Sequence, residues 1–323
     1  MKSRHVFLMF ALFNCLFLTT CKDGSEPEDY RQAMRDFVQA LRVHTDTIEP
    51  NFLLIPQNGE ELVTTGDGYD TPPADDYLAA IDGQGREDLR YGYNADNEPT
   101  PEEDAAYMQA HLQVAETNGI EALVTDYCWN ESYMADSYQE NQRWDFISFA
   151  APSRGLDVIP EYPPAPHNEN DADITKLSDA RNFLYLLDPV QFETRAAYLA
   201  ALDATTYDLF IMDAFYDDQM LTAEEVAALQ TKPNGARRLV IAYMSIGEAE
   251  DYRYYWQEDW KPGNPEFIER ENPDWEGNYK VHYWDLEWQA VIFGSADAYV
   301  DRILDAGFDG AYLDIIDAYE YFE

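Results

Sequence analysis

Short runs of apolar residues recur along the chain, and most of them end on an acidic residue. The clearest run, Leu239–Met244, stops abruptly at the polar sequence Ser-Ile-Gly-Glu-Ala-Glu. A Val/Ile/Leu run without polar alternation predicts a strand that is buried on both faces, as in parallel sheets. Similar runs occur at residues 52–58, 122–126, 157–161, 183–188, 209–213, 281–285 and 311–314. Eight such strands predict an α/β fold, a (β/α)8 TIM barrel with acidic residues at its C-terminal rim.

The two ends of the chain predict that this barrel is circularly permuted. Apolar residues recur at 3.6-residue spacing from Tyr30 to Leu41, which indicates an amphipathic helix before the first strand. The last strand, at 311–314, is followed by too few residues for the helix of a βα unit. We therefore expect this strand to pair in parallel with the strand at 52–55, and the N-terminal helix to cover the seam.

The connections contain one long irregular segment. Residues 59–100 are rich in Gly, Pro and Asp, which predicts an insertion at the barrel rim, with an accessory strand at 88–93. Helices are predicted at 100–118 and at 131–150. A further helix begins at Thr222, where Glu225 completes a capping box.

The first twenty residues are typical of a signal peptide. Lys2 and Arg4 precede an apolar run that is too short to span a bilayer. Leu18-Thr19-Thr20-Cys21 resembles the lipobox of bacterial lipoproteins, in which the Cys is lipidated, and residues 22–26 resemble a signal for surface export. We therefore expect a signal peptide at 1–20, a tether at 21–29 and one domain at 30–323, on an outer-membrane lipoprotein at the cell surface. A plain secreted protein is the alternative.

The charge of the chain restricts its partners. Sixty-three acidic against 21 basic residues give a formal net charge of −42, which excludes a nucleic-acid footprint and electrostatic binding to anionic lipid. The expected partner is a neutral or cationic polysaccharide, and the lipid anchor is the expected membrane contact. A surface adapted to salty water is an alternative origin of the charge. After processing, Cys128 is the remaining thiol, so no intramolecular disulfide is expected.

The acidic strand ends and a nearby aromatic segment indicate carbohydrate chemistry. The acids at strand ends are Asp126, Glu161, Asp188, Asp213, Glu248, Asp285 and Asp314. Glycoside hydrolysis requires one carboxylic acid and one carboxylate, and the aromatic residues at 252–284 are suited to stacking on sugar rings. Asp188 and Asp285 precede helical segments, where a capping role is the ordinary outcome.

Three motifs in the second half of the chain carry a family resemblance. SIGEAEDYRYYW, ENPDWEGNYKVHYWD and GFDGAYLDIIDAYEYF closely resemble the endo-alpha-1,4-polygalactosaminidases of glycoside hydrolase family 114, a TIM-barrel family. The resemblance covers about 180–323. In a permuted mapping, Asp314 matches the family's P-D-N motif and Asp126 takes the place of the Glu in N-E-Q-C. Tyr312 stands where the secreted branch has an acid, which leaves one catalytic acid and the substrate open.

The resemblance and the pattern together predict a site without metal or cofactor. We expect Asp314 and Asp126 to be the reacting pair, with Glu248 and Asp213 holding substrate or tuning charge; Glu248 with Asp213 is the alternative pair. Substrate contacts are predicted for Glu161, Tyr127, Tyr243, Glu250, Tyr252, Trp284, Asp285, Tyr312 and Asp317.

Two other functions remain open. A non-catalytic carbohydrate-binding lipoprotein on the same scaffold would use the same rim. A metal-dependent hydrolase is the third hypothesis, but the histidines show no HxH or HExxH spacing.

Overall fold

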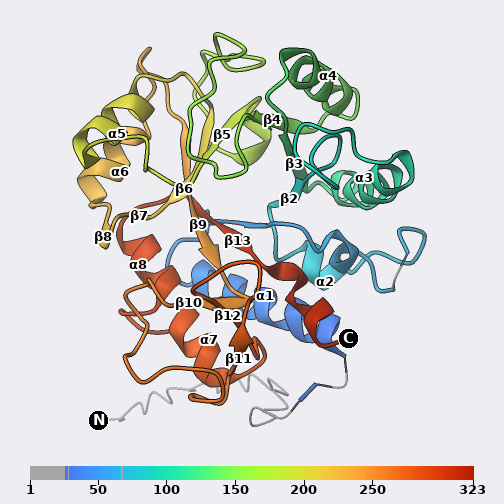
Figure 1. Cartoon of the computed structure of the whole chain (residues 1–323), viewed down its shortest axis with the longest axis vertical. Helices are drawn as coiled ribbons and strands as arrows, with labels where there is room; N and C mark the ends of the chain where they lie inside the picture. Colours follow the sequence, from blue (N-terminus) through green and yellow to red (C-terminus); the bar gives the residue numbers. More distant parts are fainter. Residues whose placement is uncertain (1–25, 28, 67) are drawn as a thin grey trace, which may run out of the picture.

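A computed structural model describes residues 26–323 except 28 and 67, so the predicted signal peptide and Cys21 lie outside the described residues. Parallel strands form the centre of the described chain (Figure 1). They are β1 (Leu53–Pro56), β2 (Gly83–Glu87), β3 (Glu121–Tyr127), β4 (Ile147–Ala151), β5 (Phe183–Leu186), β6 (Leu209–Asp213), β9 (Leu239–Ser245) and β13 (Gly310–Asp314). The pairing order is β1-β13-β9-β6-β5 in one sheet and β2-β3-β4 in another.

The two parallel sheets are joined on one side. Gln57, just after β1, forms a parallel bridge with Gly85 of β2. On the other side β4 lies beside β5, with the rings of Phe149 and Phe183 5.6 Å apart, but these strands share no hydrogen-bonded ladder. The predicted α/β fold with a parallel central sheet is thus confirmed. The strands do not form one continuous hydrogen-bonded barrel, because β4 and β5 are not paired.

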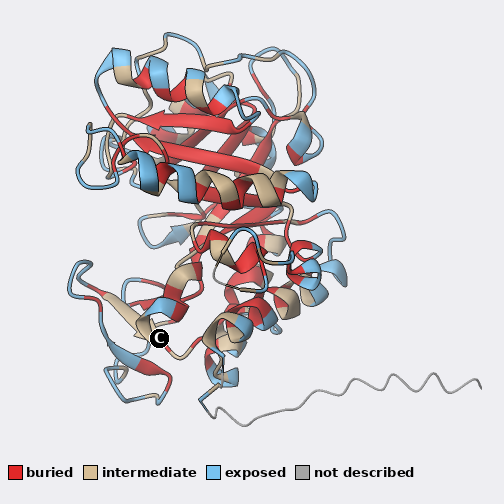
Figure 2. Cartoon of the chain, turned by 90° about the vertical axis from the view of Figure 1, so that its right-hand side faces the viewer, coloured by how far each residue is buried: buried red, intermediate tan, exposed pale blue. Residues whose placement is uncertain are grey.

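Helices cover the outer faces of the sheets, and the strands between them are buried (Figure 2). The α-helices are α1 (Tyr30–Asp46), α2 (Asp75–Leu78), α3 (Glu102–Thr117), α4 (Glu131–Gln142), α5 (Arg195–Asp203), α6 (Ala223–Leu229), α7 (Leu286–Ile292) and α8 (Tyr299–Asp305). Short 3-10 helices are η1 (Glu60–Val63), η2 (Leu177–Asp179) and η3 (Ile316–Tyr321). Among the described residues, no helix has both the length and the apolar character to cross a membrane.

Two small antiparallel units stand apart from the parallel strands. β10 (Glu248–Glu250), β12 (Asn278–Val281) and β11 (Ile268–Glu271) form a three-stranded sheet, with β12 in the middle. β7 (Phe215–Tyr216) and β8 (Gln219–Met220) form a hairpin. Both units follow the C-terminal ends of parallel strands, since β10 comes directly after β9 and β7 directly after β6.

The predicted pairing of the first and last parallel strands is confirmed. β1 pairs with β13 in parallel, with Leu54 opposite Ala311 and Ile55 opposite Tyr312. Helix α1 bonds to both sides of this seam: Arg42 Nη1 donates to Phe52 O at 2.7 Å, and His44 Nε2 lies 3.0 Å from Asp301 Oδ1 in α8. The N-terminal helix therefore occupies the position that a helix after β13 would fill.

Four local predictions are wrong. Residues 157–161 are irregular, and residues 281–285 include only the end of the antiparallel strand β12. The predicted helix at 131–150 ends at Gln142, and β4 follows it. The accessory strand lies at Gly83–Glu87 rather than 88–93, and it is a member of the parallel set.

Sterics explain how so polar a segment as Gly-Gln-Gly-Arg-Glu becomes a strand. A Cβ atom at Gly85 would lie 2.1 Å from the Tyr312 hydroxyl, and one at Gly83 would lie 2.8 Å from Leu177 Cδ2. The two glycines leave room for bulky neighbours, so β2 is stabilised by its surroundings rather than by its own side chains.

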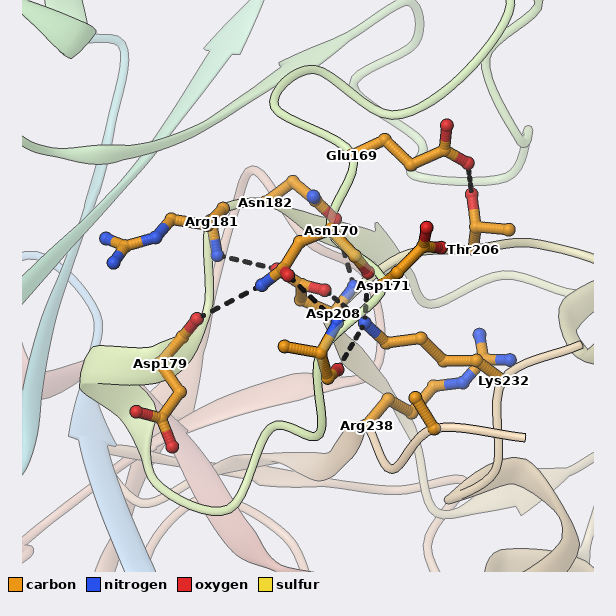
Figure 3. Close-up of polar contacts among 12 residues, drawn as sticks. Glu169, Asn170, Asp171, Asp179, Arg181, Asn182, Thr206, Asp208, Lys232 and Arg238 are labelled. Carbon is orange, nitrogen blue, oxygen red and sulfur yellow. Dashed lines mark hydrogen bonds and ion pairs between the residues drawn. The ribbon is translucent and has the colours of Figure 1, made fainter. Parts of the chain in front are cut away.

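A buried ion pair lies at the N-terminal end of β6 (Figure 3). Lys232 and Asp208 pair with both side chains fully buried. Lys232 Nζ also donates to Asn170 O at 2.7 Å, and the Arg181 backbone N–H donates to Asp208 Oδ2 at 2.8 Å. These bonds attach the long segment before β5 to the base of the sheet, so we assign this cluster a structural role.

Candidate functional site

A cavity of about 1160 Å³ opens at the C-terminal ends of the parallel strands. Residues at or just after these ends line it: Gln57 and Asn58 after β1, Glu87 of β2, Tyr127 of β3, Asp188 after β5, Asp213 of β6, Tyr243 of β9 and Asp314 of β13. The antiparallel sheet and the loops around it complete the wall with Glu248, Glu250, Asn272, Trp275 and Asn278. This is the rim that the strand pattern predicts, and its size exceeds that of most small-molecule pockets.

One amide group joins two carboxylates at the base of this cavity. Gln57 Nε2 donates to Glu87 Oε2 at 2.8 Å and to Asp314 Oδ1 at 3.1 Å. The Tyr185 hydroxyl donates to Gln57 Oε1 at 2.9 Å, which fixes the orientation of the amide. Glu87 and Asp314 therefore form a pair of neighbouring carboxylates that come from strands adjacent to β1 on either side.

Burial perturbs the pKa of both carboxyl groups. Burial, followed by the negative charge of Glu87, raises the pKa of Asp314 to about 8. Burial also raises the pKa of Glu87, although hydrogen bonds from Tyr127 and Asn58 oppose the shift. The Tyr243 hydroxyl donates to Asp314 Oδ2 in turn. At neutral pH the pair can hold a proton on Asp314 beside an ionised Glu87, which is the arrangement that acid/base chemistry requires.

The backbone directly after Asp314 adopts a costly conformation. Ile315 has φ 57° and ψ 39°, a left-handed geometry that a β-branched residue rarely adopts and that costs about 1–3 kcal/mol. Its N–H donates to Asp314 Oδ1 at 2.8 Å. Gly247 permits the close approach, since a Cβ atom there would lie 2.2 Å from Ile315 O. The left-handed conformation of Ile315 thus allows its N–H to bond to Asp314 Oδ1 and to hold the carboxylate in one orientation.

Arg154, from the loop after β4, supports Glu87 through an aromatic ring. Its guanidinium carbon lies 3.9 Å from the centre of the Tyr127 ring, and the Tyr127 hydroxyl donates to Glu87 Oε1. Arg154 also forms ion pairs with Asp88 at 2.8 Å and Asp96 at 2.6 Å. Arg154 therefore holds Asp88, just after β2, near the cavity. The same guanidinium stacks on the ring of Tyr127, whose hydroxyl bonds to Glu87.

A second pair of acids is neutralised by arginine. Arg253 bonds to Asp213 Oδ1 at 2.9 Å through Nη1 and to Glu250 Oε2 at 2.8 Å through Nε. The Tyr252 hydroxyl donates to Glu250 Oε1 at 2.6 Å. Burial raises the pKa of Asp213, against the effect of Arg253. Because the same guanidinium occupies both carboxylates, they are better suited to shaping the wall than to transferring protons.

Glu248 lies on the antiparallel sheet and is fully buried. Asn272 Nδ2 donates to its Oε1 at 2.9 Å and the Tyr321 hydroxyl donates to the same oxygen at 3.2 Å, whereas Oε2 has no hydrogen-bond partner. Burial raises the pKa of Glu248. Asp317 of η3 also lines the cavity, and burial, with repulsion from Glu320, raises its pKa to about 7.

Asp126, predicted as a member of the reacting pair, does not line the cavity. It is fully buried in β3, where it accepts bonds from Ser137 Oγ at 2.6 Å, from Asn141 Nδ2 at 3.0 Å and from the Arg90 backbone N–H at 2.6 Å. Side chains alternate along a strand, so Tyr127 faces the cavity and Asp126 faces the helical layer. The geometry therefore favours a structural role for Asp126, and Glu87 replaces it beside Asp314.

Four predicted substrate contacts lie elsewhere. Glu161 is exposed and outside the cavity lining, and Asp285 caps α7 by accepting from the Glu287 backbone N–H at 2.7 Å. Trp284 packs against Phe322, with ring centres 4.8 Å apart. Tyr312 is buried against Gly85, and its hydroxyl has no partner. The remaining predicted contacts line the cavity: Tyr127, Tyr243, Glu250, Tyr252 and Asp317.

Sequence reasoning missed Glu87, Gln57 and Arg154. Glu87 ends a strand with no apolar run, and Arg154 belongs to a loop after a strand that was assigned to a helix. One signal could have indicated Gln57 as a site residue: it follows the first apolar run, at the position where most of the other runs end on an acid. The described residues contain no group of three or more His, Cys, Asp or Glu side chains arranged to hold a metal ion.

Comparisons with known proteins give one family match and several related proteins. Residues 165–323 match the model of Glycoside-hydrolase family GH114. Uncharacterized proteins of Deinococcus radiodurans, Methanocaldococcus jannaschii and Thermotoga maritima are 44%, 36% and 38% identical over 122, 156 and 143 residues. These alignments cover 38%, 47% and 43% of this chain and 37%, 41% and 40% of the relatives, so the chain spans less than half the length of each. Asp213, Glu248 and Asp314 lie inside the family match, whereas Glu87 lies before it.

Proposed function

We propose that the protein is a member of glycoside hydrolase family GH114, whose model matches residues 165–323, and that it hydrolyses glycosidic bonds in a polysaccharide. The observation that carries the proposal is the pair of carboxylates, Glu87 and Asp314, that Gln57 joins at the base of the cavity. Because the family is one of TIM barrels, we also propose that the parallel strands are a permuted form of that barrel.

The proposed mechanism assigns different roles to the two acids. Asp314 retains its proton near neutral pH and donates it to the oxygen of the leaving sugar. Glu87 accepts hydrogen bonds from Gln57, Asn58 and Tyr127, which stabilise its ionised form, so it supplies the negative charge opposite the developing positive charge at the sugar's anomeric carbon. No metal or cofactor takes part in this mechanism.

The separation of the carboxylates favours retention of configuration. In retaining glycosidases the two carboxyl groups are about 5–5.5 Å apart, and in inverting ones about 6.5–9.5 Å. Since the same nitrogen bonds Glu87 and Asp314, the two bonded oxygens are no farther apart than the sum of its 2.8 and 3.1 Å bonds. Glu87 then attacks the anomeric carbon and forms a covalent intermediate. Water, deprotonated by Asp314, releases the sugar and restores both acids.

The proposed substrate is a polysaccharide of amino sugars, such as polygalactosamine. The charge of the cavity supports this choice: its two arginines, Arg154 and Arg253, are both paired with carboxylates, and further acids line the wall. Sugars that have lost acetyl groups carry positive charge and are concentrated by an acidic mouth. The net charge of −42 acts in the same direction.

We also propose that the protein is anchored at the cell surface by lipid on Cys21, which lies outside the described residues. The support is the sequence Leu18-Thr19-Thr20-Cys21 after an apolar run. The variant Cys21→Ala is expected to leave the membrane fraction on cell fractionation. An unchanged distribution would rule out the anchor, and protection of the wild type from protease added to intact cells would contradict display on the outer face.

The test of the proposed activity is the release of new reducing ends from partly deacetylated polygalactosamine by the purified protein. The proposal predicts reducing ends that increase with time and enzyme concentration. Binding of the polymer without reducing ends would favour the alternative, a non-catalytic carbohydrate-binding protein. Analysis of the first-formed anomer by nuclear magnetic resonance tests the stereochemistry, and an inverted product would refute the role of Glu87 as nucleophile.

A further inference from the structure

Two exposed aromatic side chains lie at the end of the cavity formed by the antiparallel sheet. Trp275 is 60% exposed and Tyr252 is 55% exposed, although both line the cavity. Most other aromatic residues of the same segment are covered: the ring centres of Trp256 and Tyr279 are 4.7 Å apart, and those of Trp260 and Phe267 are 5.3 Å apart. Packing within the loop therefore explains the presence of Trp256, Trp260 and Tyr279. It does not explain why Trp275 and Tyr252 are exposed.

Trp275 is fixed by a tight turn next to Glu248. The turn joins β11 to β12, and it is closed by the Trp275 N–H bonding to Asn272 O at 3.3 Å and the Asn278 N–H bonding to Trp275 O at 3.1 Å. Asn272 in turn holds Glu248 Oε1 through its side-chain amide. The exposed indole and the buried carboxylate are thus linked through one residue, Asn272.

One carboxylate oxygen of Glu248, Oε2, has no hydrogen-bond partner among the described residues. The other, Oε1, accepts bonds from Asn272 and Tyr321. Asn278 and Lys280 also favour the ionised form of Glu248, but Oε2 has no hydrogen-bond partner, and a buried acceptor without a partner is costly. The nearby ammonium group of Lys280 lies 3.3 Å from the centre of the Tyr321 ring. A donor from a ligand in the cavity would satisfy the free oxygen.

We propose that Trp275, Tyr252 and Glu248 form a second sugar-binding subsite, which holds a pyranose unit of the same polysaccharide at a distance from the bond that is cleaved. The apolar face of the sugar stacks on the indole, and a hydroxyl or protonated amine donates to Glu248. This inference rests on the proposed hydrolase function, since the cavity connects the subsite to Glu87 and Asp314. Its consequence is that longer oligosaccharides bind and react better than short ones.

The test measures kcat/KM for galactosamine oligosaccharides of increasing length with two matched variants. Trp275→Ala removes the platform, and Trp129→Ala removes a tryptophan of similar exposure, 57%, that does not line the cavity. Trp275→Ala is expected to lose about tenfold on long oligosaccharides and little on the shortest one that reacts, whereas Trp129→Ala matches the wild type. Equal behaviour of the two variants at every length would overturn the subsite, and so would an equal loss by Trp275→Ala at every length.

A second arm identifies the group that contacts Glu248. Glu248→Gln keeps the shape of the side chain and removes its charge, and Glu269→Gln removes a charge from the same sheet outside the cavity. If a protonated amine is bound, Glu248→Gln weakens calorimetric binding of the amine oligosaccharide about tenfold to a hundredfold but not binding of its N-acetylated form. Equal losses on both indicate a hydroxyl, and no loss on either removes Glu248 from the subsite. Tyr321→Phe, which deletes one donor to Glu248, should give a smaller loss in the same direction if Glu248→Gln fails to fold.

Calorimetry also separates the subsite from the activity. If the wild type binds the oligosaccharides, with Trp275→Ala weaker and Trp129→Ala unchanged, but releases no reducing ends, the hydrolase proposal fails and the subsite stands. If the wild type cleaves the polymer and Trp275→Ala behaves as Trp129→Ala, the subsite fails and the hydrolase stands.

Discussion

Replacement of Asp314 by Asn is expected to change how the free energy of unfolding depends on pH. In the folded protein, burial and Glu87 hold the pKa of Asp314 near 8, whereas an unfolded Asp has a pKa near 3.9. Between these values the folded state binds a proton that the unfolded state has released, so this group lowers stability as pH rises. The effect has a limit of about 1.4 kcal/mol per pH unit. Below pH 4 both states are protonated and the contribution to the pH dependence vanishes.

Urea unfolding of the wild type and Asp314→Asn at pH 4, 5, 6, 7 and 8 measures this effect. Asn does not titrate, so the variant should become progressively more stable relative to the wild type as pH rises through this window. Taking the difference between the two proteins removes the contribution of acids that both share. Glu87→Gln removes the neighbouring negative charge and should lower the pKa of Asp314 in the folded protein. In that background the effect of Asp314→Asn should therefore stop increasing at a lower pH. A difference in stability that is independent of pH would refute the assignment of a raised pKa to Asp314.

Three further substitutions test other parts of the structure through the free energy of unfolding. Arg253→Met leaves the buried Glu250 and the partly buried Asp213 without their cation and should cost about 3–5 kcal/mol; a loss below 1 kcal/mol would contradict the ion-pair geometry. Lys232→Met breaks the fully buried pair of Figure 3 and should cost a similar amount, with unchanged KM in the protein that remains folded because neither residue of the pair lines the cavity. Tyr312→Phe removes a buried hydroxyl without a partner and should leave stability equal or higher and activity unchanged, whereas a large loss of activity would restore Tyr312 to the site.

The parts of the fold that follow from apolar runs could be predicted from the sequence. The strands that end at Asp213 and Asp314 are continuous apolar runs, and the pairing of β1 with β13 was predicted with the help of the amphipathic pattern at Tyr30–Leu41, which places a helix before the first apolar run. Asp213, Glu248 and Asp314 could be placed at the cavity because each follows an apolar run, and the ends of parallel strands meet on one side of a sheet.

The parts that depend on neighbours could not be predicted in this way. Strand β2 contains two glycines whose role is to admit Tyr312 and Leu177, and a glycine-rich segment alone is typical of a loop. Glu87 was not predicted as a site residue because the strand that it ends, β2, was not predicted. Asp126 was predicted at the site because it ends an apolar run and takes the place of the family's Glu in the permuted mapping, yet the alternation of side chains directs it away from the cavity. A carboxylate at a strand end is therefore a candidate only once the face of its side chain is known.

The most direct test of the central claim, that Glu87 and Asp314 are the reacting pair, is the rate of reducing-end release by Glu87→Gln and Asp314→Asn. The matched control is Glu161→Gln, which removes an exposed acid outside the cavity. With folding verified by circular dichroism, each of the first two variants should lose at least about a hundredfold in kcat, because each lacks a general acid or the opposing carboxylate, and the control should equal the wild type. Folded variants of Glu87 and Asp314 that retain activity within about tenfold of the wild type would contradict the account.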